Sequence, residues 1–375
     1  MLSFKIDSKL TKKLIALNER ISDQSALVST LPIEELDAIH RYARISMIGA
    51  STRIENAVLT DAEINWLDTV LESDARPTAF HTNRAAIENM LSKERERSIE
   101  EVAGCRAVLA IVYAQHEDLF PLSEHAICGL HAELMRFYPP AARYAGRYKT
   151  QPNSVVETNH RTRKTRIVLK TADPGPITAT SMRGLVDWYS RSLQDEPWSI
   201  AVACEFVFRF LAIHPFQDGN GRMGRALFLL ALLQSKSPHL SKVARFLAID
   251  RQIERNKDEY YTVLNRCSGG RYLANPSDYS IEHFLHYMIK VLEESLTDIN
   301  VYRKRFQSIH DLSPAARSVY LCFGELPEKR ISSHEVCTET VLPRRTVVHS
   351  LSVLTRLGLL QKFGKGRGVR YRLVF

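Results

Sequence analysis

The twelve residues HPFQDGNGRMGR, from His214 to Arg225, bring together the side chains best suited to phosphate chemistry. Pro215, Gly219 and Gly221 prevent a regular helix in the first eight residues of this segment, and an apolar helical pattern begins near residue 222. A break before a helix lets successive backbone N–H groups point into one concavity, which suits an anion. Arg222 and Arg225, three residues apart in the first helical turn, are placed to clamp phosphate oxygens.

Two further side chains of the segment indicate how a phosphate would react. Asp218 is able to hold a Mg²⁺ that bridges phosphate oxygens. His214, at the other end of the loop, is placed to act as a general base on an attacking hydroxyl. Each feature alone is ordinary, because a lone His before Pro usually caps a helix and Asp-Gly-Asn-Gly is usually a turn. Their combination within twelve residues favours a phosphate-transfer site.

Helices on both sides of the segment must hold it in place. Apolar residues at steps of three and four predict helices at residues 36–54, 85–115, 123–137, 197–213 and 222–233. Residues 146–171 break this pattern, since turn formers mixed with β-branched residues predict a hairpin. We therefore predict a mainly α fold, a helical bundle with a small β-hairpin flap.

The composition is that of a folded protein with two or three domains. The chain has 375 residues, of which 45% are hydrophobic and 25% charged, and this excludes a disordered or collagen-like chain. Six cysteines without a C-x-x-C spacing predict buried thiols. The longest uncharged apolar run falls far short of the ~20 residues that span a bilayer. With no secretory signal pattern at the N-terminus, we expect a cytoplasmic protein with no membrane partner.

The positive charge is concentrated at the C-terminal end. The formal charge of the chain is +9, and residues 311–375 hold eleven Lys or Arg against five Asp or Glu, which is +6. Helices followed by two β-like segments around a Gly-rich turn predict a winged helix-turn-helix there. Such a domain binds DNA or, alternatively, serves protein interaction or dimerisation. The candidate DNA contacts are Arg344, Arg345, Lys362, Lys365, Arg367 and Arg370.

The segment from His214 to Arg225 resembles the signature of the Fic-domain family, His-x-Phe-x-Asp-Gly-Asn-Gly-Arg-x-x-Arg, at every specified position. EFVFRFLAIHPF, RFLAIDRQIERNKDEYYTVL and GRYKTQPNSVV are similar to neighbouring family segments, and the resemblance covers about residues 30–290. Most Fic proteins are AMP transferases. The resemblance therefore implies transfer of AMP from Mg-ATP to a Tyr, Thr or Ser hydroxyl of a target protein or of the protein itself. Gly221 favours nucleotidyl transfer, because a family variant that transfers phosphate carries Lys there.

The resemblance also implies roles for individual residues. His214 would deprotonate the target hydroxyl, Asp218 would hold Mg²⁺ on the α- and β-phosphates, and Phe216 would anchor the loop in the core. The residues implied to bind phosphate are Gly219, Asn220, Gly221, Arg222 and Arg225. Tyr260 and Tyr261 either wall the adenine site or pack in the core. The implied target-docking flap begins with Tyr148, Lys149 and Thr150.

A second motif, STRIEN, lies far upstream from Ser51 to Asn56. It matches the [Ser/Thr]-x-x-x-Glu-[Gly/Asn] inhibitory helix of autoinhibited Fic proteins. Ser51 and Glu55 are four residues apart and share one helical face. By this resemblance Glu55 would pair with Arg225 and remove the cation that the γ-phosphate needs.

These observations define the expected organisation. We expect an N-terminal helical region with the inhibitory helix at residues 1–105, a Fic catalytic domain at 106–300 and a winged helix domain at 308–375. The leading hypothesis is an autoinhibited protein adenylyltransferase. The alternatives are a DNA-binding regulator whose Fic domain senses nucleotide, transfer of another nucleotide, and removal of AMP. A homodimer is left open, and His125 and His131 are interpreted as helix packing.

Overall fold

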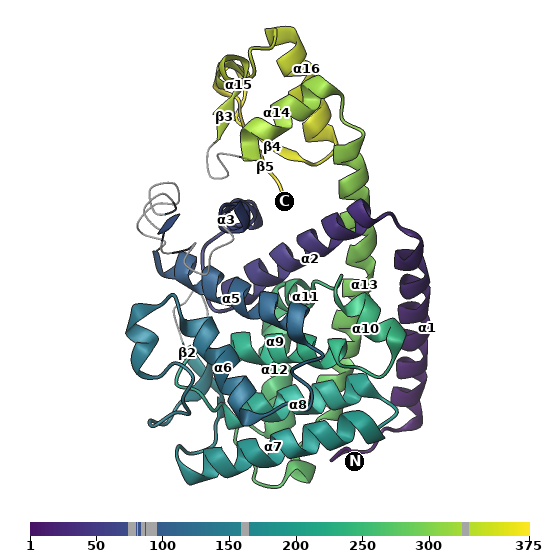
Figure 1. Ribbon diagram of the computed structural model, residues 1–375, viewed down its shortest axis with the longest axis vertical. Coiled ribbons are helices and arrows are strands. Elements are labelled where there is room, and N and C mark those ends of the chain that lie inside the picture. The colour runs from purple at the N-terminus through teal and green to yellow at the C-terminus, as the bar shows by residue number, and fades with distance from the viewer. Residues whose placement is uncertain (74–79, 81, 84–86, 88–95, 159–164, 325–329) are drawn as a thin grey trace. The chain divides into compact units, whose positions relative to one another are not determined.

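A computed structural model of the chain, drawn as a ribbon in Figure 1, describes residues 1–73, 80, 82–83, 87, 96–158, 165–324 and 330–375. Its elements fall into two compact units. The first comprises residues 1–57 and 100–299, and the second comprises residues 58–99 and 300–375. The first hundred residues are thus divided between the units. The mainly α fold with small antiparallel sheets is confirmed.

The first unit is a helical bundle. Its helices are α1 (Ser8–Thr30), α2 (Ile33–Ile54), most of α5 (Glu96–Gln115), α6 (Glu124–Met135), α7 (Pro176–Asp195), α8 (Ser199–Ile213), α9 (Asn220–Leu233), α10 (Pro238–Ala244), α11 (Ile249–Arg255), α12 (Lys257–Ser268) and the first part of α13 (Glu282–His310). The part of the predicted helix at 85–115 that precedes α5 lies mostly outside the described residues. No helix in the described ranges combines the length and the apolar character needed to cross a bilayer.

Helices α8 and α9 form the centre of this bundle. Every residue of α8 except Arg209 is buried, and every residue of α9 except Gly221 is buried. A helix that is apolar on all sides must be surrounded by other elements, and in Figure 1 the two helices lie among α6, α7, α10 and α12. Their burial gives the loop between them, residues 214–219, two rigid ends.

The predicted hairpin is confirmed. Strands β1 (Ser154–Thr158) and β2 (Thr165–Lys170) are antiparallel, with a register shift between Val155 and Val156. Their connection, residues 159–164, lies outside the described residues. On the other side of β2, the Tyr272 N–H donates to Lys170 O at 2.7 Å. The Lys170 end of β2 is therefore already bonded on its outer side, and β2 is the only described strand that pairs with β1.

The second unit follows the element order predicted for the C-terminal region. It contains α3 (Asp61–Ser73), the end of α13, α14 (Pro314–Gly324), β3 (Ile331–Ser332), α15 (Ser333–Thr340), α16 (Arg344–Arg356), β4 (Leu360–Phe363) and β5 (Arg370–Leu373). The three strands form an antiparallel sheet in the order β3-β5-β4. Val319, Val347 and Leu351 belong to its core, to which Ala62 of α3 also contributes. Strand β3 is an addition to the predicted elements.

Candidate active site

A cavity of about 210 Å³ in the first unit lies at the N-terminus of α9, between the end of α2, strand β1 and α12. The structure brings most of the predicted site residues to its walls. The predicted residues that line it are Glu55, His214, Asp218, Gly219, Asn220, Gly221, Arg222, Arg225, Tyr260 and Tyr261. Residues as far apart in sequence as Glu55 and Tyr261 therefore meet at one helix end.

His214 sits directly after α8 in a left-handed backbone conformation, with φ of 54°. Its Nδ1 lies 3.2 Å from Leu211 O, which only accepts hydrogen bonds, so Nδ1 carries the proton and Nε2 is left as the acceptor. Burial, and to a smaller extent the nearby Lys149 cation, lower the pKa of His214 to about 4. At neutral pH the imidazole is uncharged and able to take a proton.

The loop after His214 is closed by its own side chains. Phe216 is fully buried, its N–H donates to Asn220 Oδ1 at 2.9 Å, and Asn220 Nδ2 donates back to Phe216 O at 2.7 Å. The Asn220 side chain, which the resemblance assigns to phosphate, is thus engaged inside the loop. Asn220 is the first residue of α9, so its backbone N–H, rather than its side chain, is the group that could bind an anion at the helix end.

His131 is a site residue whose role the sequence did not indicate. Its ring stacks on Phe216 with centroids 3.7 Å apart and planes 3° apart, which agrees with the packing interpretation. It also links two backbones, because Gly146 N donates to Nδ1 at 2.9 Å and Nε2 therefore donates to Asp218 O at 3.0 Å. Burial lowers its pKa to about 4, which keeps the ring neutral. Its partner Asp218 is 87 residues away in the sequence, so no local spacing of residues predicts this hydrogen bond.

Gly219 and Asp218 shape the start of α9. Gly219 has φ of 79°, which favours glycine, and a Cβ there would lie 2.3 Å from Met135 Cε, so a larger residue would be strained and would displace Met135. Asp218 Oδ1 accepts from Gly219 N at 2.6 Å, and its side chain is 39% exposed. Because the N-cap residue is Gly219, it has no side chain that could accept a hydrogen bond from the first N–H groups of α9. These donors and the helix dipole favour an anion at this end.

Arg225 is 3% exposed and is held from three directions. Its Nε donates to Ser51 Oγ at 3.0 Å, and its Nη2 donates to Ser51 O and to Glu55 Oε1, both at 2.9 Å. Asp250 Oδ2 lies 3.5 Å from Nε. In the described part of the chain, the buried Nη1 has no hydrogen-bond partner. A buried donor of this kind is costly unless a ligand satisfies it, so Arg225 has capacity for a further anion.

Glu55 lies over the N-terminus of α9. It follows the last residue of α2, and Asn56 then turns the chain with φ of 78°, a conformation that asparagine and glycine tolerate best. A Cβ on Gly221 would lie 2.2 Å from Glu55 Oε1, so the carboxylate occupies the space above the helix end. Burial alone would raise the pKa of Glu55, but Arg225 and Arg222 hold it below its usual range.

Asp250, at the start of α11, is a second carboxylate on Arg225 that the sequence did not single out. It is 2% exposed, and burial raises its pKa to about 6 although Arg225 opposes this. The only signal is a charged residue at the end of the apolar run FLAID. Arg222 lies near two other carboxylates: its guanidinium is 3.9 Å from Glu101 and 3.7 Å from Asp218.

The predicted flap residues have different environments. Tyr148 OH donates to Glu124 Oε2 at 2.8 Å, Lys149 is 3% exposed, and Thr150 is exposed. None of the three lines the cavity among its described walls. Tyr260, in contrast, lies in the cavity wall and its ring packs against Tyr261, which agrees with both interpretations of this pair.

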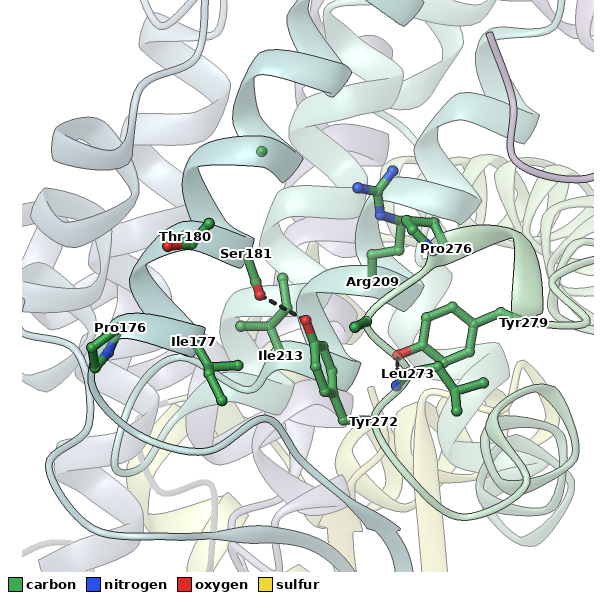
Figure 2. Close-up of a pocket in the computed structure, with 12 residues that line it drawn as sticks. Pro176, Ile177, Thr180, Ser181, Arg209, Ile213, Tyr272, Leu273, Pro276 and Tyr279 are labelled. Atoms are coloured by element: carbon green, nitrogen blue, oxygen red, sulfur yellow. Dashed lines mark hydrogen bonds between the residues drawn. The ribbon is translucent and has the colours of Figure 1, made fainter.

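A larger cavity of about 520 Å³ lies elsewhere in the first unit, and Figure 2 shows its lining. Ser181 Oγ and Tyr272 OH are 2.7 Å apart across it, and Tyr279 OH accepts from Leu273 N at 2.7 Å. The one charged side chain on its described walls, Arg209, is bonded to the buried Glu205 at 3.1 Å. None of the predicted site residues lines it. Cavity size therefore does not identify the cavity that the predicted phosphate-binding residues line.

The predicted DNA contacts lie in the second unit. Arg344, Arg345, Lys362 and Lys365 are exposed. Arg370 is engaged within the protein, since its Nη1 lies 3.1 Å from Glu335 Oε2 and donates to Arg330 O at 3.0 Å. The side chain of Arg367 lies outside the described part of the chain.

Comparisons with known proteins show what part of this chain is similar to. Residues 121–232 match the Fic/DOC family. A Fido domain-containing protein of Dictyostelium discoideum is 43% identical over 61 residues, which are 16% of this chain and 41% of that relative's length. The chain thus spans less than half the length of this curated relative.

Solved structures share the fold. A Fic family protein from Desulfovibrio desulfuricans is similar over all of this chain and 98% of its own, with 21% identity and a TM-score of 0.55. A Fic domain-containing signaling protein from Bacteroides thetaiotaomicron covers 78% of this chain and 97% of its own, with 20% identity and a TM-score of 0.56. Fic-1 from C. elegans covers 79% of this chain and 73% of its own, with 19% identity and a TM-score of 0.56.

Proposed function

From the premise that this chain contains a Fic domain, we propose that it is an autoinhibited protein adenylyltransferase, which transfers AMP from Mg-ATP to a protein hydroxyl. Fic proteins generally transfer a nucleoside monophosphate to proteins. The observation that carries the proposal is the Glu55 carboxylate over the N-terminus of α9, bound to Arg225 at 2.9 Å. An anion site with a carboxylate already in it is what a controlled phosphate-binding enzyme requires.

The reaction assigns one step to each group. The target hydroxyl oxygen forms a bond to the α-phosphorus of ATP, the bond from that phosphorus to the bridging oxygen of the β-phosphate breaks, and pyrophosphate leaves. The hydroxyl proton passes to Nε2 of His214, whose Nδ1 is already protonated toward Leu211 O. The N–H groups of α9 and the guanidinium of Arg222 neutralise charge on the phosphates. Most of this work is positioning, which suits a rigid loop between two buried helices.

Asp218 is the residue proposed to hold Mg²⁺. Its carboxylate offers hard oxygen atoms, is partly exposed and lines the cavity. No group of three or more His, Cys, Asp or Glu side chains in the described ranges is suited to a metal. This fits Mg²⁺ bound by one carboxylate together with substrate phosphates. When bound, the ion would supply positive charge to the phosphate oxygens.

Inhibition follows from the competition for Arg225. Glu55 uses Nη2 of Arg225 and fills the space above Gly221, where an incoming phosphate would lie. A nucleotide would then bind without the γ-phosphate contact and in an unproductive position. Transfer of another nucleotide and removal of AMP remain the alternatives within this class, because the residues proposed to bind phosphate do not distinguish one base from another.

Mass spectrometry of the product separates these reactions. Purified wild type, Glu55→Gly and Glu55→Gly/His214→Ala are incubated with Mg²⁺ and each of ATP, GTP, CTP and UTP, and intact masses are recorded. We expect AMP adducts on Glu55→Gly with ATP, and none on the His214 variant. Adducts of another nucleoside monophosphate identify another donor. An adduct of phosphate alone, or no adduct and no nucleotide binding by Glu55→Gly, would contradict the proposal.

Nucleic-acid binding by the second unit is a second candidate function. The 13 residues of α16 include no Asp or Glu, and Arg344, Arg345 and Arg356 are exposed on the helix. The order of helices and the hairpin β4–β5 support a winged helix, in which this helix would enter the major groove. Lys362 and Lys365 are the exposed cations of the wing region.

Salt dependence tests this second candidate. Binding to a duplex of mixed sequence is measured by fluorescence anisotropy at several salt concentrations, for wild type and Arg344→Ala/Arg345→Ala. If both arginines contact phosphate, the double variant lowers the slope of log K against log salt by about 2. Equal slopes for both proteins, or no binding at low salt, would count against a role in DNA binding.

A further inference from the structure

Lys149 has contacts that its predicted place on the docking flap does not explain. Its ammonium donates to Asn153 Oδ1 at 2.8 Å, Thr171 Oγ1 at 3.0 Å and Ile213 O at 3.1 Å. An ammonium has three N–H donors, so all three are used inside the protein. With the side chain 3% exposed, no donor is left for a docking target.

Two of the bonds of Lys149 bracket His214. Its backbone N–H donates to Pro215 O at 2.7 Å, and its ammonium binds Ile213 O. These are the carbonyls of the residues on either side of His214, whose φ is 54°. A left-handed conformation is unfavourable for a residue other than glycine and persists where the surroundings fix it. Lys149 supplies two of the contacts that fix it.

The other two acceptors of the ammonium join the ends of the hairpin. Asn153 directly precedes β1 and Thr171 directly follows β2. Thr171 Oγ1 lies 2.8 Å from Asn153 O, and Asn153 Nδ2 donates to Phe216 O at 2.7 Å. One buried ammonium therefore connects both ends of the flap with the loop that carries His214.

Charged groups from three directions face His214. Lys149 disfavours the imidazolium, whereas Glu55 at the end of α2 and Asp218 in the loop favour it. Burial is the largest cause of the low pKa of His214 and acts in the same direction as Lys149. The buried cation thus helps to keep the imidazole neutral in addition to holding its backbone.

We propose that Lys149 is a positioning residue, which holds His214 and the flap in one fixed relation. This proposal rests on the proposed function, because the flap edge β1 is where a target segment would add. Lys149 is buried and is not itself among the residues that line the cavity. Its loss therefore lowers the rate of transfer while nucleotide binding is kept.

The test compares two lysines of the same flap in a Glu55→Gly background. Lys149→Met removes the buried ammonium, and Lys170→Met makes the same change at an exposed position at the end of β2. We expect Lys149→Met to lower kcat at least about tenfold, since misplaced reacting groups lose rate steeply. The nucleotide Kd should stay within about twofold of the parent, because Lys149 does not line the cavity and its loss removes no direct contact with a nucleotide there. Lys170→Met should change neither value.

The pH profile distinguishes positioning from general damage. Removing the positive charge of Lys149 should raise the pKa of His214, so kcat should begin to fall at a higher pH as the solution is made more acidic. Lys149→Arg keeps the charge and should restore the original pH. NMR titration of the His214 imidazole provides a readout that needs no activity, with an expected rise in pKa of about one pH unit in Lys149→Met. If Glu55→Gly transfers no nucleotide, the proposed function fails, and the NMR titration still decides the role of Lys149.

Two outcomes would contradict the proposed role of Lys149. The same kcat, pH profile and imidazole titration in Lys149→Met as in its parent would overturn the proposal. If thermal melting shows that Lys149→Met is unfolded, Thr171→Val replaces it, because it removes one acceptor of the ammonium and keeps the side-chain shape. A kcat and pH profile for Thr171→Val equal to those of the parent would then refute the proposal.

Discussion

The two units use arginine in opposite ways. At the N-terminus of α9, Arg222 and Arg225 are 4% and 3% exposed and each lies within 4 Å of two carboxylate side chains. On α16, Arg344 and Arg345 are exposed in a helix without acidic residues. The C-terminal region holds +6 of the net charge of +9, yet the cations arranged for phosphate chemistry lie in the nearly neutral remainder. Burial and fixed geometry, rather than net charge, therefore locate the candidate site.

The largest expected effect on nucleotide transfer comes from replacing a buried arginine, compared with replacing an exposed one. In the Glu55→Gly background, Arg225→Ala removes a preorganised cation and should lower kcat/KM for nucleotide transfer about 10²–10³-fold. Arg345→Ala, on the exposed face of α16, should leave transfer unchanged. Rates are measured with labelled ATP, and thermal melting verifies that both variants fold. Equal transfer by the two variants would remove the basis for the contrast.

The next prediction concerns the buried histidine that supports the loop. His131 has a folded-state pKa of about 4, below the value near 6.5 of an unfolded chain. Between these values only the unfolded chain binds the proton, so its contribution to stability is present above pH 6.5 and is lost as the pH falls toward 4. His131→Gln should reduce this acid loss by up to roughly 3 kcal/mol.

Urea unfolding from pH 4.5 to 7.5 measures that change. The glutamine can still accept from Gly146 N and donate to Asp218 O, so the fold should persist. His349→Gln, at an exposed position of α16, is the matched control in the other unit. The same pH dependence in His131→Gln as in wild type would show that His131 is not the group that titrates.

A smaller effect is expected from a methyl group above α9. Gly221→Ala places its Cβ 2.2 Å from Glu55 Oε1, so the inhibitory carboxylate must move. Basal nucleotide transfer should rise several-fold and stay below that of Glu55→Gly, since part of the anion site is then filled. Gly368→Ala, whose Cβ would meet nothing within 4 Å, serves as the control in the other unit. Unchanged basal transfer in Gly221→Ala, with Glu55→Gly active, would disprove the steric part of the inhibition.

The smallest effect is expected at the surface of the second unit. Arg370 and Glu335 form an ion pair at 3.1 Å with side chains 50% and 36% exposed. Arg370→Ala should lower the free energy of unfolding by less than about 1 kcal/mol, because water screens exposed pairs. Urea denaturation measures it, and a loss several times larger would mean that exposed arginines are as firmly embedded as Arg225.

Local patterns predicted more of this molecule than long-range contacts did. The loop and helix at His214 to Arg225 follow from Pro215, the glycines and the apolar run after them, and the hairpin follows from its β-branched residues. The bond from His131 to Asp218 O and the pairing of Asp250 with Arg225 were not predicted, because only the packing of distant helices brings these partners together. The sequence indicated that Lys149 belongs to the flap but not that its side chain is buried, since a sequence does not show whether a lysine points inward.

The rate of nucleotide transfer by Glu55→Gly relative to wild type tests the central claim most directly. Both proteins are incubated with the same labelled Mg-ATP, and label on protein is followed in time. Loss of a charge-assisted contact of about 1.5–3 kcal/mol predicts a rate at least about tenfold higher in the variant. The added His214→Ala change should abolish this gain. Equal rates in two folded proteins that both bind ATP would contradict an anion site held closed by Glu55.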